Sequence, residues 1–181
     1  MEFPEGVGRK CVRGVCRNER DRYSLLLKSR RFWDSFKCDR ILLMQSDSVL
    51  CRNSEMSLSD FFEYEYIGGH TPSINNGSRI HMNGGLSFRH RAGMLRCLET
   101  QTPQDAKQED TFFSQCKELQ QPPVDVLDRF AIDNAWKPVS AKSAPLGVHR
   151  PWVSDHGHNA SNMAACEGAW DLRERMLSST P

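Results

Sequence analysis

The residues that could do chemistry begin with a lone carboxylate at the end of an apolar run. Residues 41–45 are Ile-Leu-Leu-Met-Gln, and they lead into Ser46, Asp47 and Ser48 before apolar residues resume. A short apolar run between polar residues indicates a buried strand. Ligands of open α/β sheets bind outside the carboxyl ends of strands, so Asp47 could hold a metal ion or a sugar. The alternative is a structural role, in which Asp47 only caps a turn.

Three later segments carry residues suited to the same kind of site. They are Asn83-Gly84-Gly85, Glu109-Asp110 and Gly147-Val148-His149. Two consecutive glycines let a backbone approach a ligand closely, although Asn-Gly also fits a plain hairpin turn. Acidic residues at the start of a helix can supply a general base or simply satisfy the helix N-terminus. His149 could be a metal ligand or a hydrogen-bonded histidine of the core.

These segments occur in a fixed order with three others, Phe32-Trp33, Gln45-Ser-Asp-Ser48 and Tyr66-Ile-Gly68, between about residues 23 and 152. The ordered set resembles a family of unknown function that is similar to glycosyltransferases of the A-type fold. The pattern of that family has Phe-Trp before the strand, then Gln-Thr-Asp-Ser and Tyr-Ile-Gly. Asn-Gly-Gly-Leu-Ser, Glu-Asp-Val-Phe-Phe and Gly-Val-His follow. Each piece is weak alone, and the specificity lies in their order.

The resemblance implies an inverting transfer of a sugar from a nucleotide-sugar donor to a glycan or another hydroxyl acceptor. It implies that Asp47 and His149 hold Mn²⁺ or Mg²⁺, which would neutralise the leaving diphosphate. Asp110 would be the catalytic base, with Glu109 as the second choice. The residues expected to line the donor and acceptor are Gln45, Ser46, Asn83, Gly84 and Gly85.

This chain departs from the two-carboxylate metal motif usual in such enzymes, because positions 45 and 46 are Gln and Ser. Metal affinity would therefore depend on Asp47, His149 and the diphosphate itself. The expected fold class is α/β, a partial A-type (Rossmann-like) mixed sheet flanked by helices that lacks the N-terminal βαβ unit. The alternative function is a non-catalytic, truncated or degenerate module of that fold, which binds a glycan or a protein partner.

Apolar periodicity predicts the elements that must position these residues. An amphipathic helix is expected from Asn18 to about Phe36, with Lys28 on its solvent face. Ser57 with Asp60 three residues later is the pattern of a capped short helix near residues 58–63. The remaining expectations are strands at 64–68, after a Gly84-Gly85 turn and at 130–133, and helices at 92–99, from 109, at 124–130 and up to 177.

The expected organisation is an irregular leader (1–17), a glycosyltransferase-like domain (18–152) and a polar segment with a C-terminal helix (153–181). The net charge of +1 gives no overall field for nucleic acid, although the first 40 residues hold 11 basic and 6 acidic side chains. The sequence holds no run of 18 apolar residues, which is about the length needed to span a membrane.

Cysteine usage sets expectations for redox state and compartment. The 7 cysteines are odd in number and include no Cys-x-x-Cys pair, which argues against both a disulfide framework and a zinc module. Cys51 and Cys97 are expected to be core thiols. Cys11 and Cys16 are expected to be two exposed thiols, with a bond between them as the alternative. Without a signal-peptide pattern the chain is expected in the cytoplasm, or in the secretory-pathway lumen if an N-terminal anchor is missing.

Overall fold

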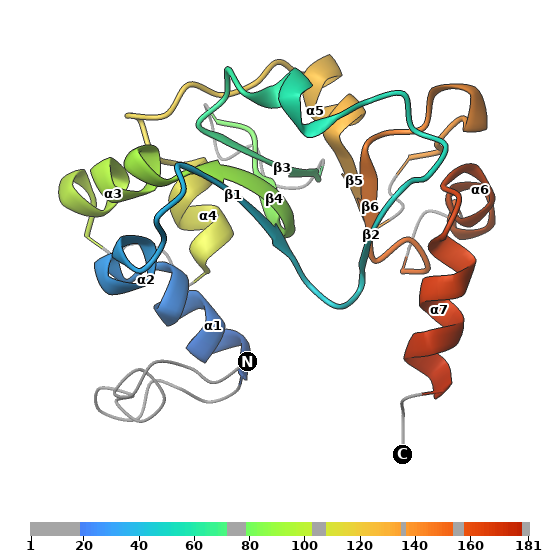
Figure 1. The fold of residues 1–181 in the computed structure, drawn as a ribbon, viewed down its shortest axis with the longest axis horizontal. Coiled ribbons are helices and arrows are strands. Elements are labelled where there is room, and N and C mark those ends of the chain that lie inside the picture. Colours follow the sequence, from blue (N-terminus) through green and yellow to red (C-terminus); the bar gives the residue numbers. More distant parts are fainter. Residues whose placement is uncertain (1–18, 72–78, 103–107, 135–136, 154–157, 179–181) are drawn as a thin grey trace.

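A computed structural model describes residues 19–71, 79–102, 108–134, 137–153 and 158–178. Its centre is a six-stranded sheet with the strand order β1-β4-β3-β5-β6-β2 (Figure 1). The strands are β1 (Arg40–Met44), β2 (Ser48–Leu50), β3 (Tyr66–His70), β4 (Met82–His90), β5 (Ala131–Asp133) and β6 (Gly147–His149).

The α-helices are α1 (Glu19–Leu27), α2 (Arg30–Asp34), α3 (Arg91–Thr100), α4 (Glu109–Ser114), α5 (Val124–Phe130), α6 (Asn159–Ala165) and α7 (Ala169–Ser178). Two 3-10 helices, η2 (Leu58–Phe61) and η3 (Ala141–Ser143), lie in the connections. The predicted α/β class, with a mixed sheet flanked by helices, is therefore confirmed.

The sheet contains both parallel and antiparallel pairs. β4 pairs antiparallel with both β1 and β3, and β2 pairs antiparallel with β6. The central pairs β3–β5 and β5–β6 are parallel. β5 and β6 therefore end at the same edge of the sheet, where Asp133 and His149 lie side by side.

All the described α-helices except α5, which packs on β3, lie in two groups at opposite ends of the molecule (Figure 1). Helices α1 to α4 gather near β1 and β4, and α6 and α7 lie beside β2. The larger core cluster includes Trp33, Tyr66 and Phe113, and a smaller one joins Val148 of β6 to Met163 of α6.

The expected helix over residues 18–36 is two helices instead. The chain leaves the helical conformation at Ser29, whose φ of −104° and ψ of 125° are extended. The break turns Trp33 into the core, where its ring N–H donates to the Leu27 carbonyl at 2.7 Å. Lys28, predicted on the solvent face, is buried, while Leu25 is 43% exposed. The prediction of one continuous helix with a single apolar face is therefore wrong.

Other expectations hold with one correction. Ser57 and Asp60 form the predicted capping box, at the start of the 3-10 helix η2. The strands near 41–45, 64–68 and 130–133 are present as β1, β3 and β5. The Asn83-Gly84-Gly85 segment, however, is no turn before a strand, because it lies inside β4. It is irregular there, since Gly68 of β3 pairs with Ser87 and Gly69 with Asn83, which leaves residues 84–86 of β4 as a bulge.

The expectation of core thiols is also wrong. Cys51 is bonded to Cys166 and Cys97 to Cys116, and all four are buried. The first bond ties the strand end of β2 to the C-terminus of α6, and the second ties α3 to the residues after α4. Cys11 and Cys16 lie outside the described residues, and among those described Cys38 is a free, exposed thiol.

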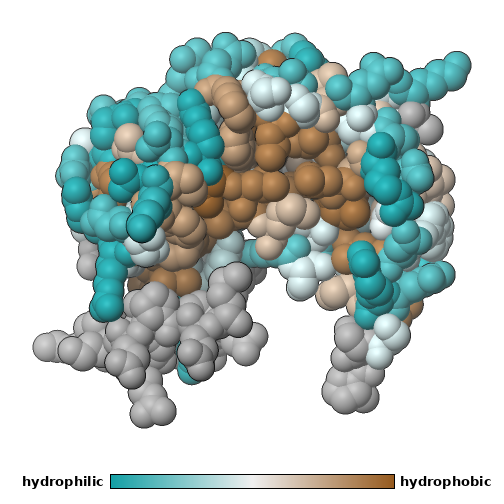
Figure 2. All heavy atoms as spheres, viewed as in Figure 1, coloured by the Kyte–Doolittle hydropathy of each residue, from teal (hydrophilic) through white to brown (hydrophobic). Residues whose placement is uncertain are grey.

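The face seen in Figure 2 has hydrophobic residues across its centre, in the region where Figure 1 places β1, β4 and β2. Exposed apolar side chains include Met44 at the end of β1 and Phe62 after η2. Among the described residues no strand pairs with the outer edge of β1. None of the described helices has the length and apolarity needed to cross a membrane.

Candidate functional site at the carboxyl ends of the strands

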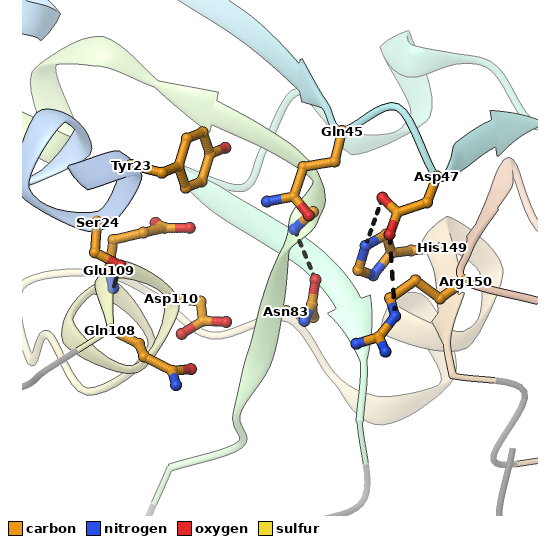
Figure 3. Close-up of a pocket in the computed structure, with 11 residues that line it drawn as sticks. Tyr23, Ser24, Gln45, Asp47, Asn83, Gln108, Glu109, Asp110, His149 and Arg150 are labelled. Carbon is orange, nitrogen blue, oxygen red and sulfur yellow. Dashed lines mark hydrogen bonds and ion pairs between the residues drawn. The ribbon is translucent and has the colours of Figure 1, made fainter. Parts of the chain in front are cut away.

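A cavity of ≈ 370 Å³ opens where β1, β4 and β6 meet α1 and α4 (Figure 3). It brings together seven of the predicted site residues, which are Gln45, Asp47, Asn83, Gly85, Glu109, Asp110 and His149. The other lining residues are Tyr23, Ser24, Gln108 and Arg150. Ser46 and Gly84, also predicted, do not line the cavity. The residues that line it come from segments more than 100 positions apart.

A tight turn between β1 and β2 positions Asp47. The carbonyl of Gly85 accepts hydrogen bonds from the Gln45 N–H at 2.7 Å and from the Ser48 hydroxyl at 2.9 Å. The Ser48 N–H donates to the Gln45 carbonyl at 3.0 Å and closes the turn. Because both ends of the turn are fixed to β4, the Asp47 side chain has a defined direction into the cavity.

Strand register places three titratable side chains in a row. His149 lies opposite Ser48 in the antiparallel β2–β6 pair and beside Asp133 in the parallel β5–β6 pair. His149 Nδ1 is 2.6 Å from Asp133 Oδ1, and its Nε2 is 3.2 Å from Asp47 Oδ1. The row is therefore Asp133, His149, Asp47, running from the core to the cavity.

Hydrogen bonds fix both oxygens of the Asp133 carboxylate. It is 1% exposed, and its other oxygen accepts from the Thr71 hydroxyl at 2.8 Å and the Asn134 amide at 3.0 Å. A carboxylate in this position accepts the Nδ1–H of His149 and leaves Nε2 toward the cavity. The same arrangement orients histidines that bind metals in proteins.

His149 and Asp47 perturb each other's pKa. Burial alone would lower the pKa of His149, but the carboxylates of Asp133 and Asp47 outweigh it and raise that pKa. Burial would likewise raise the pKa of Asp47, yet His149 holds it below its ordinary value. The Nε2–Asp47 contact has an ion-pair distance without the direction of a hydrogen bond, so Nε2 is buried without a hydrogen-bond partner.

The two glycines of β4 make room for both sides of the site. A Cβ atom on Gly85 would lie 2.3 Å from His149 Nε2, so only glycine lets the imidazole lie against this strand. A Cβ on Gly84 would lie 2.0 Å from a carboxylate oxygen of Glu109. Asn83 adds a fixed amide, since its side-chain oxygen accepts from the Gly85 N–H at 2.6 Å.

Glu109 is committed to a buried ion pair. Arg89 is fully buried, and its two terminal nitrogens lie 2.7 and 3.2 Å from the two Glu109 oxygens. The rings of Trp33, Tyr66 and Phe113 surround the guanidinium. Burial raises the pKa of Glu109 against the opposing effect of Arg89. With both oxygens engaged, Glu109 supports the site and is a poor choice for the base.

Asp110 is the carboxylate that α4 presents to the cavity. One of its oxygens accepts from the Thr111 N–H at 2.7 Å. The other lies 3.8 Å from His81 Nε2, outside hydrogen-bond distance. Figure 3 shows Asp110 on the side of the cavity opposite Asp47 and His149, with Asn83 between them. Its second oxygen is therefore open to a ligand.

Arg150 adds a positive charge at the end of the cavity near Asp47. Its backbone has a φ of 50°, unusual for a residue with a side chain. Its N–H donates to the Asp47 carbonyl at 2.9 Å, and its guanidinium lies 3.9 Å from an Asp47 oxygen. The constraint holds this guanidinium at the cavity.

A family model described as a protein of unknown function, DUF5672, matches residues 12–149. The chain belongs to the DUF5672 family. No curated protein and no solved structure matches the chain. The match ends at His149, so it spans all the predicted site residues but not Arg150.

Sequence analysis of this DUF5672 chain missed Asp133, Arg89, Tyr23 and Arg150. Asp133 had a usable signal, since Phe-Ala-Ile-Asp is an apolar run ending in a carboxylate, as in the strand before Asp47. Arg89 had none, because an arginine in a strand gives no sign of burial.

The donor set of the DUF5672 site suits a divalent cation only in part. Among the described residues, no group of three His, Cys, Asp or Glu side chains could hold a metal ion. Asp47 and His149 would supply two ligands, one oxygen and one nitrogen, a combination that suits Mn²⁺. The buried, unpartnered Nε2 of His149 fits a metal-bound imidazole. Any further ligands would come from a substrate or from water.

Proposed function

We propose that this DUF5672 chain is an inverting glycosyltransferase with a Rossmann-like, A-type fold. It would transfer a sugar from a nucleotide-sugar donor to a hydroxyl of a glycan or another acceptor. The observation that carries the proposal is the meeting of Asp47, His149 and Asp110 around one cavity. The parallel strands β5 and β6 support it, because such folds bind ligands at the carboxyl ends of strands.

The Asp47 end of the cavity suits the diphosphate of the donor. Arg150 and His149 offer a guanidinium and an imidazole there, and both can face phosphate oxygens. A bound Mn²⁺ or Mg²⁺, held by Asp47 and His149, would supply Lewis-acid neutralisation of the leaving diphosphate. Asp133 fixes the ring of His149, so Nε2 carries either a proton or the metal ion.

The opposite end suits the proton transfer. Asp110 takes the proton of the acceptor hydroxyl while the hydroxyl oxygen forms a bond to the anomeric carbon. The bond from that carbon to the phosphate oxygen breaks, and its electron pair leaves with the nucleoside diphosphate. A base and a leaving group on opposite sides of the sugar give inversion. The buried Arg89–Glu109 pair keeps α4, and with it Asp110, in place.

The test is turnover of nucleotide sugars by the full chain. Release of UDP or GDP from a panel of UDP- and GDP-hexoses is measured with and without MnCl₂. Asp110→Asn is expected to lower the rate by about 10²–10⁴-fold, the range for loss of a general base. The matched control is Asp125→Asn, since Asp125 is exposed on α5 outside the cavity.

Two results would contradict the proposal. One is an unchanged rate in Asp110→Asn. The other is a folded wild-type chain that binds UDP or GDP without any turnover, which is the outcome expected of a binding module. Folding of each variant is monitored by circular dichroism.

A further inference from the structure

The cavity has two chemically different ends. Asp47, His149 and Arg150 carry charges at one end. At the other end, α1 and α4 contribute an aromatic ring, a hydroxyl, an amide and one open carboxylate, from Tyr23, Ser24, Gln108 and Asp110. Figure 3 shows these two groups apart, with Gln45 and Asn83 between them. The second group has no role yet beyond that of Asp110.

We infer that the end of the cavity lined by α1 and α4 is a subsite for a neutral sugar ring. The ring of Tyr23 lies against the apolar C–H face of the sugar, and Ser24, Gln108 and Asp110 bind its hydroxyls. Its catalytic meaning rests on the proposed transferase function, whereas sugar binding can be measured without it.

The residue types at this end match the two sides of a sugar ring. Axial and ring C–H groups carry partial positive charge and pack on the negative face of an aromatic ring. Ring hydroxyls are donors and acceptors, and the lining offers a carboxylate, an amide and a hydroxyl to pair with them. Small-molecule pockets commonly measure about 300–1,000 Å³, and this cavity lies in that range.

Charge at this end favours a neutral ligand. The carboxylate of Glu109 is already neutralised by Arg89, so it neither attracts nor repels a ligand strongly. Asp110 faces the cavity as a carboxylate with the imidazole of His81 3.8 Å away. An anionic sugar would meet that carboxylate. Burial raises the pKa of the Tyr23 phenol, so this side chain stays neutral and can donate its proton.

Two features keep Tyr23 and Ser24 at the cavity. The Ser24 hydroxyl accepts from the backbone N–H of Glu109 at 3.4 Å, which joins α1 to the start of α4. Tyr23 packs against the main core cluster and interacts with Gln45. The aromatic face is therefore preorganised, which lowers the entropic cost of binding.

The test is binding of methyl hexosides by saturation-transfer NMR and calorimetry. The probes are the methyl glycosides of glucose, galactose and mannose, with methyl glucuronide as the matched anion. Wild type is expected to bind at least one hexoside, and more tightly than the glucuronide. Tyr23→Phe keeps this affinity, whereas Tyr23→Ala loses about tenfold, as expected for one aromatic contact.

Controls separate binding from folding. Phe62→Ala removes an exposed aromatic ring outside the cavity and is expected to leave binding unchanged. If Tyr23→Ala unfolds, Tyr23→Leu keeps the apolar volume and removes only the aromatic face. No hexoside binding, or binding unaffected by Tyr23→Ala and by Tyr23→Leu, overturns the inference.

The source of the sugar ring is decided by competition. A hexoside that binds together with a UDP- or GDP-hexose occupies an acceptor position, and one that competes occupies the position of the transferred sugar. Tyr23-dependent hexoside binding without any sugar transfer would contradict the transferase and leave the subsite. Sugar transfer that is unaffected by Tyr23→Leu would support the transferase and contradict the subsite.

Discussion

The row of Asp133, His149 and Asp47 shows how a single strand-end carboxylate gains a defined setting. Asp47 and His149 contact each other because β2 and β6 are paired in register, and Asp133 joins them through β5. None of the three would be oriented alone. The buried carboxylate fixes the ring, and the ring then contacts the partly buried Asp47, so the setting of Asp47 depends on a residue that does not line the cavity.

Asp133→Asn is predicted to weaken Mn²⁺ and nucleoside diphosphate binding. An amide cannot fix the imidazole as a carboxylate does, and loss of such a support typically costs about 10–100-fold in metal affinity. Titration of the variant with Mn²⁺, followed by calorimetry with UDP or GDP, measures the change. Asp128→Asn is the matched control, because Asp128 pairs with His70 at 2.5 Å and does not line the cavity. Equal losses in both variants would mean a general structural effect.

Most residues that line the cavity could be predicted from the sequence, because their types and their order along the chain form a recognisable pattern. Asp47, Asp110 and His149 were predicted and do meet. Glu109 illustrates the limit. It lies beside Asp110 in the sequence, but only tertiary structure shows that Arg89 engages both of its oxygens. A partner twenty residues away, buried among aromatic rings, leaves no local pattern.

At the scale of elements, periodicity predicted most strands and helices and failed where a polar residue is buried. Lys28 falls between two helices and is buried, which one continuous amphipathic helix could not accommodate. The Asn83-Gly84-Gly85 segment has the composition of a turn, yet it lies inside β4 as part of a bulge, and Glu109 and His149 occupy the space of the absent side chains. Local propensity yields to packing in both places.

The junction of β3, β4 and α3 depends on Glu65. Its carboxylate lies 2.6 Å from Arg96 of α3 and 3.5 Å from His90, the last residue of β4. Partial burial would raise the pKa of Glu65, but Arg96 and His90 outweigh it and hold that pKa below its ordinary value of 4.5. The carboxylate form is therefore favoured by folding.

Glu65→Gln is predicted to destabilise the chain at neutral pH by about 0.5–1 kcal/mol, since solvent screens this partly exposed pair. A lowered folded pKa stabilises above pH 4.5, and the effect disappears as the pH falls through the folded pKa. Urea unfolding from pH 7 to pH 3 should show the difference between wild type and variant shrinking with acid. A difference that is constant with pH would contradict this origin. Glu118→Gln, at an exposed residue, is the control.

At the scale of the molecule, one disulfide holds the α6–α7 group to the sheet and the other joins two segments of the α1–α4 group. The Cys51–Cys166 bond connects residues 115 positions apart and joins α6 to the sheet beside α7. The sequence predicted free thiols instead, because the number of cysteines is odd and none are closely paired. Pairing across such a separation depends on the final fold, so the cysteine pattern alone could not predict it.

The disulfides bear on the compartment. Stable disulfides are rare in the reducing cytosol and common in the secretory pathway. We propose that the chain folds in an oxidising compartment, the secretory-pathway lumen, where nucleotide-sugar chemistry would act on glycans. One of the two bonds, Cys97–Cys116, ties α3 to the residues that follow the helix of Asp110.

Removing the disulfides is predicted to destabilise the chain, and more so for the bond that closes the longer loop. The separations of 115 and 19 residues correspond to losses of about 5 and 3 kcal/mol in the free energy of unfolding. The comparison uses Cys51→Ser with Cys166→Ser, and Cys97→Ser with Cys116→Ser, in urea unfolding without reductant. Cys38→Ser, at a free and exposed thiol, should stay within about 0.5 kcal/mol of wild type. Because Cys116 closely follows the helix of Asp110, loss of the Cys97–Cys116 bond should also weaken hexoside binding. An unfolding midpoint of the wild type that is unchanged by dithiothreitol would argue against both bonds and against the oxidising compartment.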